Sequence, residues 1–238
     1  MWRVTDILLS SGRISKSWNI STVIIMMKKV DNLRLGILLS GGGRTMVNIA
    51  ECIERGEIEA NIAVVISSRG AVAGVKRAQN LGIEPHIVRT KDYPDVETFS
   101  ARIGDLLDQA EADLVLQCGW LCLWRIPPRY ENRVMNIHPA LLPSFGGKGM
   151  WGHHIHEAVL KRGCKISGCT VHFANNEYDA GPIIVQRCCA VQEGDDADTL
   201  AARVFEQECL AYPQAIRLYA QNRLRIRNGC AHILGDSP

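Results

Sequence analysis

The sequence predicts an α/β fold with a mainly parallel, doubly wound sheet and an antiparallel extension toward the C-terminus. Short apolar runs alternate with segments of helical periodicity from residue 33 onward. The runs are apolar throughout, as expected for strands that are covered on both faces. Strands that are separated by helices of about 10–15 residues are joined by right-handed crossovers and therefore run parallel.

The first half of the chain alternates regularly between predicted strands and helices. Strands are expected over residues 33–39, 61–67, 83–88, 113–119 and 133–138. Helices are expected over residues 44–58, 71–82 and 96–112. The first helix illustrates the evidence, because Met46, Ile49, Ala50 and Ile53 have helical spacing and Gly56 follows as a stop signal.

After residue 150 the predicted elements become longer and the strands no longer alternate with helices. The expected elements are a helix over 154–163, strands over 167–174 and 182–191, a long helix over 197–221 and an edge strand over 223–227. Gly163 supplies a stop signal for the first of these helices. Pro213 predicts a bend or a restart within the long helix, because proline removes a backbone donor.

These elements form one predicted domain, residues 33–227. Residues 1–32 are interpreted as a disordered extension or as the product of a misassigned start, with Met26 or Met27 as the natural start. The apolar run near the end of this extension is too short to span a membrane. Residues 228–238 are interpreted as a loose tail.

The amino-acid composition and net charge indicate which kinds of binding partner the protein has. Of the 238 residues, 47% are hydrophobic and 22% are charged, and the net charge is +2. A charge so close to balance does not favour a broad nucleic-acid-binding face. The 9 cysteines lie mostly in apolar segments, which is typical of free thiols in a reducing compartment. We therefore expect a cytoplasmic protein without nucleic-acid or membrane partners.

A glycine-rich stretch, SGGGRTMVN (residues 40–48), lies between the first predicted strand and the first predicted helix. Glycines let the backbone approach a ligand, and the helix N-terminus offers free N–H groups to an anion. This predicts a phosphate site at Gly43, Arg44 and Thr45. The motifs that bind nucleoside triphosphates or dinucleotides are absent, which favours a monophosphate. The alternative is a tight turn without a ligand.

Asn136 and His138 end the fifth predicted strand in the sequence NIHP. Side chains alternate along a strand, so both point to the same side and can donate to one oxygen that becomes negative. Asp179 lies in a turn, YDAGP, before a later strand. A carboxylate beside His138 would raise the pKa of the imidazole and favour its charged form. The alternatives are a histidine satisfied within the core and an aspartate that only caps its turn.

Two patterns that suggest metal binding are weak. Cys118 and Cys122 lack a second cysteine pair or a histidine partner at zinc-finger spacing. His154 and His156 are two residues apart, which is poor spacing for two ligands on one helical face, and HExxH is absent. We expect no metal.

The segments LLSGGGRT, NIHPALLP, GCTVHFANNEYDAGPIIVQ and ARVFEQECLAYPQAI resemble the phosphoribosylglycinamide formyltransferase family. The resemblance extends from about residue 33 to residue 227. It implies a Rossmann-like formyltransferase fold and transfer of a formyl group from the cosubstrate 10-formyltetrahydrofolate to the amine of glycinamide ribonucleotide, a step of purine synthesis. It also implies small-molecule substrates, no metal, and a monomer or homodimer.

The resemblance also implies residue roles. Asn136, His138 and Asp179 match the family's catalytic trio. The family's phosphate loop falls on Gly43, Arg44, Thr45, Met46 and Val47, and its late substrate-binding glutamate falls on Glu208. Its folate pocket falls on Leu121, Cys122, Leu123, Trp124, Asn136, Glu177 and Tyr178.

Two positions depart from the family pattern, and both lie on the folate side. Leu121, Cys122 and Leu123 occupy a segment in which family members commonly carry an arginine, and another common arginine aligns near Val96. Lys148, in a longer loop, is a candidate replacement contact. The alternatives for function are a formyltetrahydrofolate hydrolase, which uses the same trio with water as acceptor, and a noncatalytic sugar-phosphate-binding domain.

Overall fold

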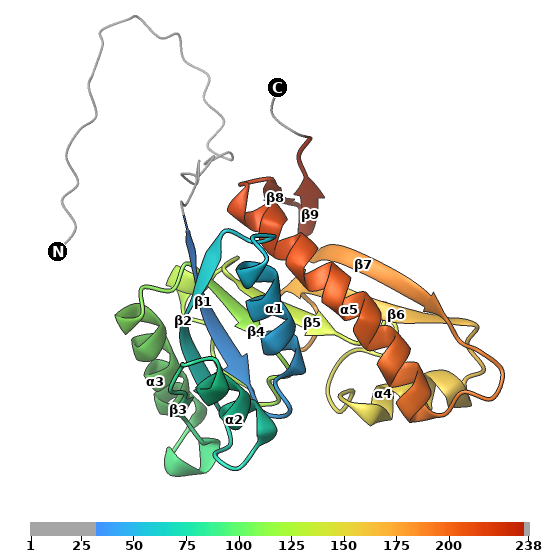
Figure 1. Cartoon of the computed structure of the whole chain (residues 1–238), viewed down its shortest axis with the longest axis horizontal. Coiled ribbons are helices and arrows are strands. Elements are labelled where there is room, and N and C mark those ends of the chain that lie inside the picture. The colour runs from blue at the N-terminus through green and yellow to red at the C-terminus, as the bar shows by residue number, and fades with distance from the viewer. Residues whose placement is uncertain (1–31, 236–238) are drawn as a thin grey trace, which may run out of the picture.

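The computed structural model describes residues 32–235, and the predictions made for residues 1–31 lie outside this range. Its centre is a seven-stranded sheet with the strand order β3-β2-β1-β4-β5-β6-β7 (Figure 1). The strands are β1 (Leu33–Leu39), β2 (Ala60–Ser67), β3 (His86–Ile87), β4 (Leu114–Gln117), β5 (Val134–His138), β6 (Ile166–Phe173) and β7 (Ile183–Ala190). β1 to β5 pair in parallel, and β6 and β7 extend the sheet in antiparallel pairing. The predicted fold class is confirmed.

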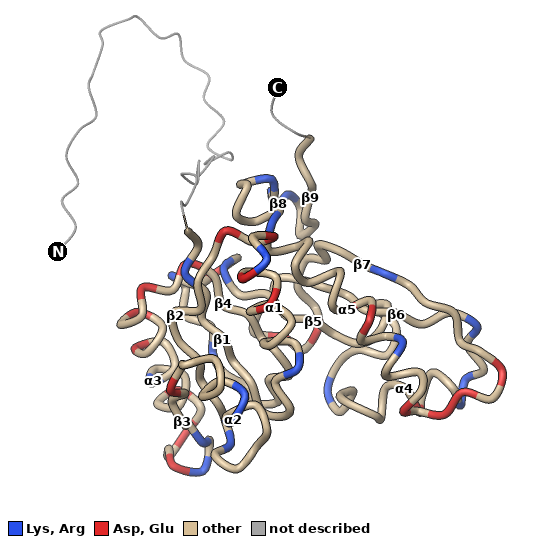
Figure 2. Tube along the Cα trace, in the orientation of Figure 1, with Lys and Arg blue, Asp and Glu red and all other residues tan. Residues whose placement is uncertain are grey.

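Helices cover both faces of this sheet. They are α1 (Arg44–Glu54), α2 (Ala73–Asn80), α3 (Val96–Gln109), α4 (His153–Lys161) and α5 (Ala197–Ala220). Side chains of β1 alternate between two hydrophobic cores, because Ile37 packs with residues of α1 and α5 whereas Leu38 packs with residues of α3. This two-sided burial explains why the central strands are apolar throughout. The central strands β4 and β5 contain no Lys, Arg, Asp or Glu, and charged residues are marked on other parts of the chain (Figure 2).

α5 runs unbroken through Pro213, where the sequence predicted a bend or a restart. Proline has no N–H group, so the carbonyl of Cys209, four residues earlier, loses its partner within the helix. The side-chain amide of Asn48 in α1 donates to this carbonyl at 3.2 Å. The neighbouring helix therefore satisfies the acceptor that proline leaves free.

The expected tail at 228–238 contains a strand, so the prediction of a loose tail is wrong for residues 230–233. β8 (Leu224–Arg227) and β9 (Cys230–Ile233) form a separate two-stranded antiparallel sheet. β8 is therefore an edge strand of this hairpin and not of the main sheet. Asn228 and Gly229 join the two strands with φ angles of 51° and 75°, the left-handed pair that a tight hairpin turn requires.

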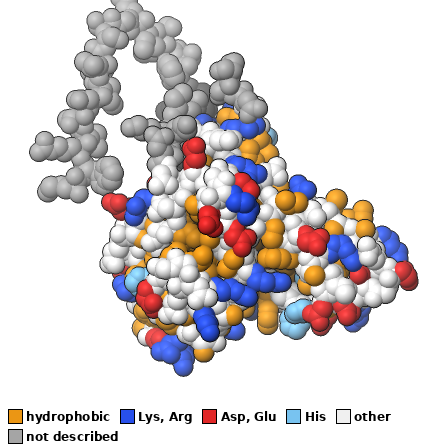
Figure 3. Space-filling view, in the orientation of Figure 1, with side chains coloured by type: hydrophobic (Ala, Val, Ile, Leu, Met, Phe, Trp, Pro, Cys, Tyr) orange, Lys and Arg blue, Asp and Glu red, His pale blue; other side chains and the backbone are white. Residues whose placement is uncertain are grey.

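Positive and negative charges are nearly balanced in the chain, with a net charge of +2. Figure 3 shows acidic, basic and hydrophobic side chains interspersed over the visible face, in keeping with the balanced net charge. Within residues 32–235, none of the helices combines the length and the apolar character that crossing a membrane would need.

The carboxyl ends of β1, β4 and β5 place three loops next to one another. β1 and β4 are neighbours in the sheet although β2 and β3 lie between them in the chain, so the loops that follow them diverge and leave a crevice. The backbone N–H of Ser40, after β1, donates to the carbonyl of Gly119, after β4, at 3.0 Å. The candidate site lies at this end of the sheet.

Candidate active site

A cavity of about 490 Å³ opens between the loops at the carboxyl ends of β1, β4 and β5. The loop after β1 and α5 form one side, and the segment after β4 together with the loop between β6 and β7 forms the other. Asn136, His138 and Asp179 line it between these two sides. The structure therefore brings the predicted catalytic trio together in one cavity.

His138 is held between a backbone carbonyl and a carboxylate. Its side chain is 4% exposed at the end of β5. Nε2 lies 2.8 Å from the carbonyl oxygen of Phe145, and Nδ1 lies 3.6 Å from Oδ1 of Asp179. A carbonyl only accepts, so Nε2 carries a proton and donates. A second proton on Nδ1 would face the carboxylate, so both ring nitrogens of a protonated His138 would lie near oxygen atoms that stabilise the positive charge.

In the free protein, burial affects the pKa of His138 more strongly than the Asp179 carboxylate does. It lowers the pKa of His138 below its ordinary value, although Asp179 and the Phe145 carbonyl both act to raise it. Asp179 thus raises the pKa of His138 as predicted, but the net shift is downward, so the prediction that the charged form is favoured is wrong for the site without substrate. The carboxylate offsets part of the cost of burying the charge, and further negative charge in the cavity would offset more.

Asp179 is positioned by the turn that contains it. Its φ angle is 54°, a left-handed conformation that aspartate tolerates better than most residues. The backbone N–H of Gly147 donates to its Oδ2 at 2.9 Å. Burial alone would raise the pKa of Asp179, but the neighbouring imidazoles of His172 and His138 and this N–H together hold it below its ordinary value. The carboxylate is thus ionised at neutral pH.

His172 lines the cavity beside the trio, and it is not among the site residues predicted from the sequence. It lies opposite Asn136 in the antiparallel pairing of β5 with β6. Its Nδ1 is 2.9 Å from the carbonyl oxygen of Phe173, so in the neutral ring Nε2 is an acceptor. The side-chain amide of Asn136 donates to this Nε2 at 3.1 Å and lies 3.4 Å from Oδ1 of Asp179. His172 therefore orients the Asn136 amide, so that its second N–H donates to Oδ1 of Asp179.

The glycine-rich loop after β1 forms a close-packed helix N-terminus. Gly43 precedes α1 with a φ angle of 72°, and a Cβ there would overlap the backbone of Gly74 in α2. No side chain caps α1, so its first N–H groups remain available. Gly42, Arg44 and Thr45 line the cavity, whereas the side chain of Met46 is fully buried in the core. Gly43 and Val47 are not part of the cavity wall.

Arg44 and Glu208 bring opposite charges to the same side of the cavity. The guanidinium of Arg44 lies 4.2 Å from the ring centroid of Phe205 in α5. One turn further along α5, Glu208 faces the cavity. Burial raises the pKa of Glu208 to about 7, although Arg44 acts in the opposite direction. This side therefore offers the guanidinium cation of Arg44, the N–H groups at the start of α1, and a carboxyl group, Glu208, whose pKa is close to neutral pH.

The residues predicted to bind folate line the opposite side. Leu121, Cys122, Leu123, Trp124, Glu177 and Tyr178 all contribute to the cavity wall. Leu121 is 40% exposed and Tyr178 is 49% exposed, so apolar surface is open at the mouth. Lys148, considered as a replacement contact, is not part of the wall, although Gly147 and Gly149 on either side of it are.

A buried serine connects the two sides. The hydroxyl of Ser68 donates to Oγ of Ser40 at 2.7 Å, and the backbone N–H of Leu121 donates to the same oxygen at 2.9 Å. Ser40 thus ties the start of the glycine-rich loop to the start of the predicted folate segment. Among residues 32–235, no cluster of three or more potential metal ligands is present.

Comparison with known proteins agrees with this arrangement. Residues 33–216 match the family model described as formyl transferase. The chain is 35% identical over 196 residues to the chloroplastic phosphoribosylglycinamide formyltransferase of Vigna unguiculata, covering 80% of this chain and 62% of that protein. It is 30% identical over 221 residues to the trifunctional purine biosynthetic protein adenosine-3 of Gallus gallus, covering 92% of this chain and 22% of that protein.

Solved structures show the same likeness in three dimensions. The glycinamide ribonucleotide transformylase 1 of Symbiobacterium toebii superposes with a TM-score of 0.80 at 36% sequence identity. The match covers 86% of this chain and 95% of that one. The chain therefore belongs to the formyl transferase family.

Proposed function

We propose that the chain transfers the formyl group of 10-formyltetrahydrofolate to the amine of phosphoribosylglycinamide, a step of purine biosynthesis. The single observation that carries the proposal is the meeting of Asn136, His138 and Asp179 within one cavity, between a phosphate-type helix N-terminus and an apolar mouth. The names of the similar proteins support the same substrates. A cytoplasmic location and a monomer or homodimer stay predictions.

The two sides of the cavity divide the substrates between them. The phosphate would bind the N–H groups at the start of α1, with Arg44 adding positive charge and Glu208 accepting from the ribose. The folate would bind along Leu121 to Trp124 and against Tyr178. The amine and the formyl carbon then meet beside His138, which supplies proximity before any chemical step.

The residues of the trio match the charge that develops in the reaction. When the amine attacks the formyl carbon, the carbonyl oxygen becomes an oxyanion and the amine nitrogen becomes positive. Asn136 donates to the oxyanion, whose charge favours protonated His138, and Nδ1 of this ring, which is not hydrogen-bonded to Asp179, is the second donor. Asp179 accepts the proton that the amine loses, and this proton passes to the departing nitrogen of the folate. Collapse of the tetrahedral intermediate then breaks the bond between carbon and folate nitrogen and leaves the formylated amine.

The proposal is tested by following tetrahydrofolate formation from 10-formyltetrahydrofolate, with and without phosphoribosylglycinamide. Turnover that requires the acceptor, with formylated ribonucleotide as product, is the expected result. Equal turnover without the acceptor would identify a hydrolase instead. Absence of turnover in both mixtures, together with retained binding of the ribonucleotide, would identify a noncatalytic binding domain.

A further inference from the structure

Buried polar atoms without a hydrogen-bond partner concentrate around the cavity. Among residues 32–235 these atoms are Oδ1 of Asn61, Nε1 of Trp120, Nε1 of Trp124, Nδ1 of His156 and Oγ of Ser167. Trp120, Trp124 and His156 all line the cavity. Buried polar groups in folded proteins are nearly always hydrogen-bonded, so these three cavity-lining side chains stand out because the protein itself does not satisfy all their polar atoms.

His156 is the least explained of the three. It lies in the second turn of α4, is 4% exposed, and the proposed mechanism does not use it. Neither of its ring nitrogens bonds to any residue in the described part of the chain, and Nδ1 is enclosed by protein. Burial, with His153 and His138 nearby, lowers the pKa of His156 to about 4. The ring is therefore neutral at pH 7 and offers one donor and one acceptor.

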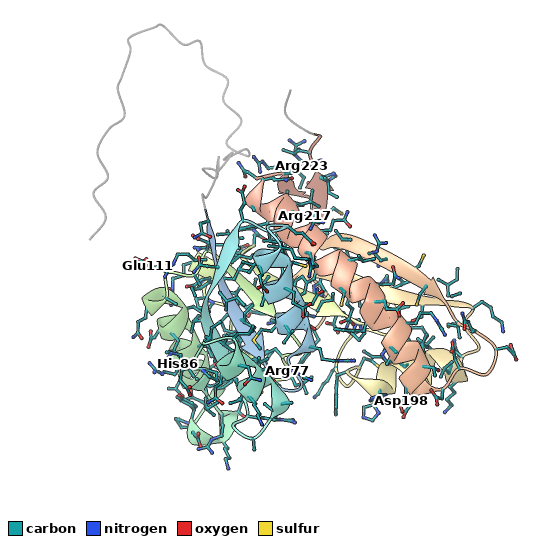
Figure 4. All side chains as sticks on the ribbon, viewed as in Figure 1. Arg77, His86, Glu111, Asp198, Arg217 and Arg223 are labelled. Atoms are coloured by element: carbon teal, nitrogen blue, oxygen red, sulfur yellow. The ribbon has the colours of Figure 1, made fainter. Side chains whose placement is uncertain are left out.

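The surroundings of His156 place it on the ribonucleotide side of the cavity. Its ring centroid lies 6.4 Å from that of His153, whose Nδ1 is 3.5 Å from Oδ1 of Asp198. Asp198, labelled in Figure 4, marks the start of α5 beside α4. The same helix α5 carries Phe205, which packs under Arg44 of the glycine-rich loop. His156 thus lies on a helix that packs against α5, the helix that carries Phe205 and Glu208 on the phosphate side.

We propose that Nε2 of His156 donates a hydrogen bond to an oxygen of the ribonucleotide that lies between its phosphate and its amine, and so helps to position the substrate. Nε2 is assigned because Nδ1 is enclosed while the side chain lines the cavity. In this tautomer the proton is on Nε2, which faces the ligand, and Nδ1 keeps an unpaired lone pair inside the protein. The substrate oxygens available there are ribose hydroxyls and the amide oxygen. This inference rests on the proposed function.

Three substitutions test the proposal. His156→Gln places an amide nitrogen near the position of Nε2, His156→Asn places one near Nδ1, and His156→Leu removes both. We expect the KM for phosphoribosylglycinamide to rise about fivefold to tenfold in the Leu and Asn variants, the size of one neutral hydrogen bond. The Gln variant should stay within about twofold of the original protein. The KM for 10-formyltetrahydrofolate should change less than about twofold in all three.

The matched control is His154→Gln, because His154 lies on the same helix with its side chain 58% exposed. It should leave both KM values unchanged. The proposal is overturned if His156→Leu leaves the KM for the ribonucleotide unchanged, if both KM values rise together, or if Asn restores binding as well as Gln does.

Direct binding separates this inference from the proposed function. Calorimetric titration of the ribonucleotide, without folate, should show the same order of affinities as the KM values. If the original protein binds the ribonucleotide in this order but transfers no formyl group, only the proposed function fails. If it transfers the group and the three variants bind equally well, only the role of His156 fails. Absence of ribonucleotide binding by the original protein overturns both.

Discussion

At the end of β5, one imidazole has partners on both ring nitrogens. Nε2 of His138 donates to Phe145, and Nδ1 faces Asp179 at 3.6 Å. Burial keeps this ring mostly neutral in the free protein, because desolvation lowers its pKa further than the carboxylate raises it. A site of this kind gains a proton when negative charge enters it. The charge of His138 is thus coupled to the oxyanion that it would stabilise.

Removing either member of this pair should abolish most activity. His138→Ala deletes a donor to the oxyanion, and Asp179→Ala deletes the charge that opposes desolvation, so we expect kcat to fall about 10²–10³-fold in each. Steady-state kinetics with both substrates saturating measures the effect. Circular dichroism should show a retained fold. Asp179→Asn keeps the shape but not the charge, and near-normal turnover in that variant would contradict the role given to the carboxylate.

The sequence could predict the trio but not its fourth member. Asn136 and His138 are two residues apart on a strand, so their shared orientation follows from local geometry. His172 lies 36 residues beyond Asn136 in the chain, and its place depends on the register of β5 against β6. The register of two strands depends on packing across the sheet, and it cannot be deduced from the residues of either strand alone. The direction of the pKa shift of His138 failed for the same reason, because burial is a property of the packed molecule.

At the scale of elements, the turn between β6 and β7 determines where Asp179 lies. Gly181 follows two residues later, and a Cβ built there would overlap the carbonyl of Phe173 at the end of β6. Its φ angle is not in the left-handed range, so the constraint is space and not backbone conformation. The glycine lets the chain close tightly after Asp179, which keeps the carboxylate over the end of the sheet.

Gly181→Ala is therefore expected to destabilise the protein by more than about 2 kcal/mol and to lower kcat by displacing Asp179. Urea unfolding and steady-state kinetics measure the two effects. Gly70→Ala is the matched control, because a Cβ at Gly70 meets only ordinary van der Waals contact with Ile87. A Gly181→Ala variant with unchanged stability would show that the turn can open without cost.

In the hairpin of β8 and β9, only the first strand is predicted from the sequence. The pair Asn228-Gly229 is the strongest short hairpin signal in the tail. Leu224 and Ile226 alternate with Arg225 and Arg227, so the first strand of the hairpin is predicted, whereas Cys230, Ala231, His232 and Ile233 show no such alternation and leave the second strand without a clear pattern. By contrast, β1 to β5 could be predicted from long apolar runs, since burial on both faces leaves an unambiguous pattern.

At the scale of the whole molecule, buried neutral histidines make stability depend on pH. His156 has a pKa of about 4 in the folded protein, and its ordinary value near 6.5 applies when the chain is unfolded. Between these values the unfolded chain binds a proton that the folded protein does not. The contribution to stability is therefore complete above about pH 6.5 and is lost as the pH falls toward about 4. Burial of His138 acts in the same direction.

Lowering the pH from about 7 to about 5 should thus reduce the free energy of unfolding by about 2 kcal/mol through His156 alone. Urea denaturation at both pH values measures this loss. His156→Gln should remove that part of the pH dependence, whereas His154→Gln, on an exposed side chain, should keep it. A His156→Gln variant as sensitive to acid as the original protein would refute this account.

The serine that connects the two sides of the cavity has a consequence for which molecules can react. Ser40, directly after β1, links the anion-holding turn to Leu121 through its buried hydroxyl oxygen. The distance between the turn that would hold the phosphate and the site of formyl transfer is therefore fixed, and it limits the length of acceptor that can react. An acceptor whose arm between phosphate and amine is one or two atoms too long or too short would be held in the cavity with its nitrogen out of reach of the carbon.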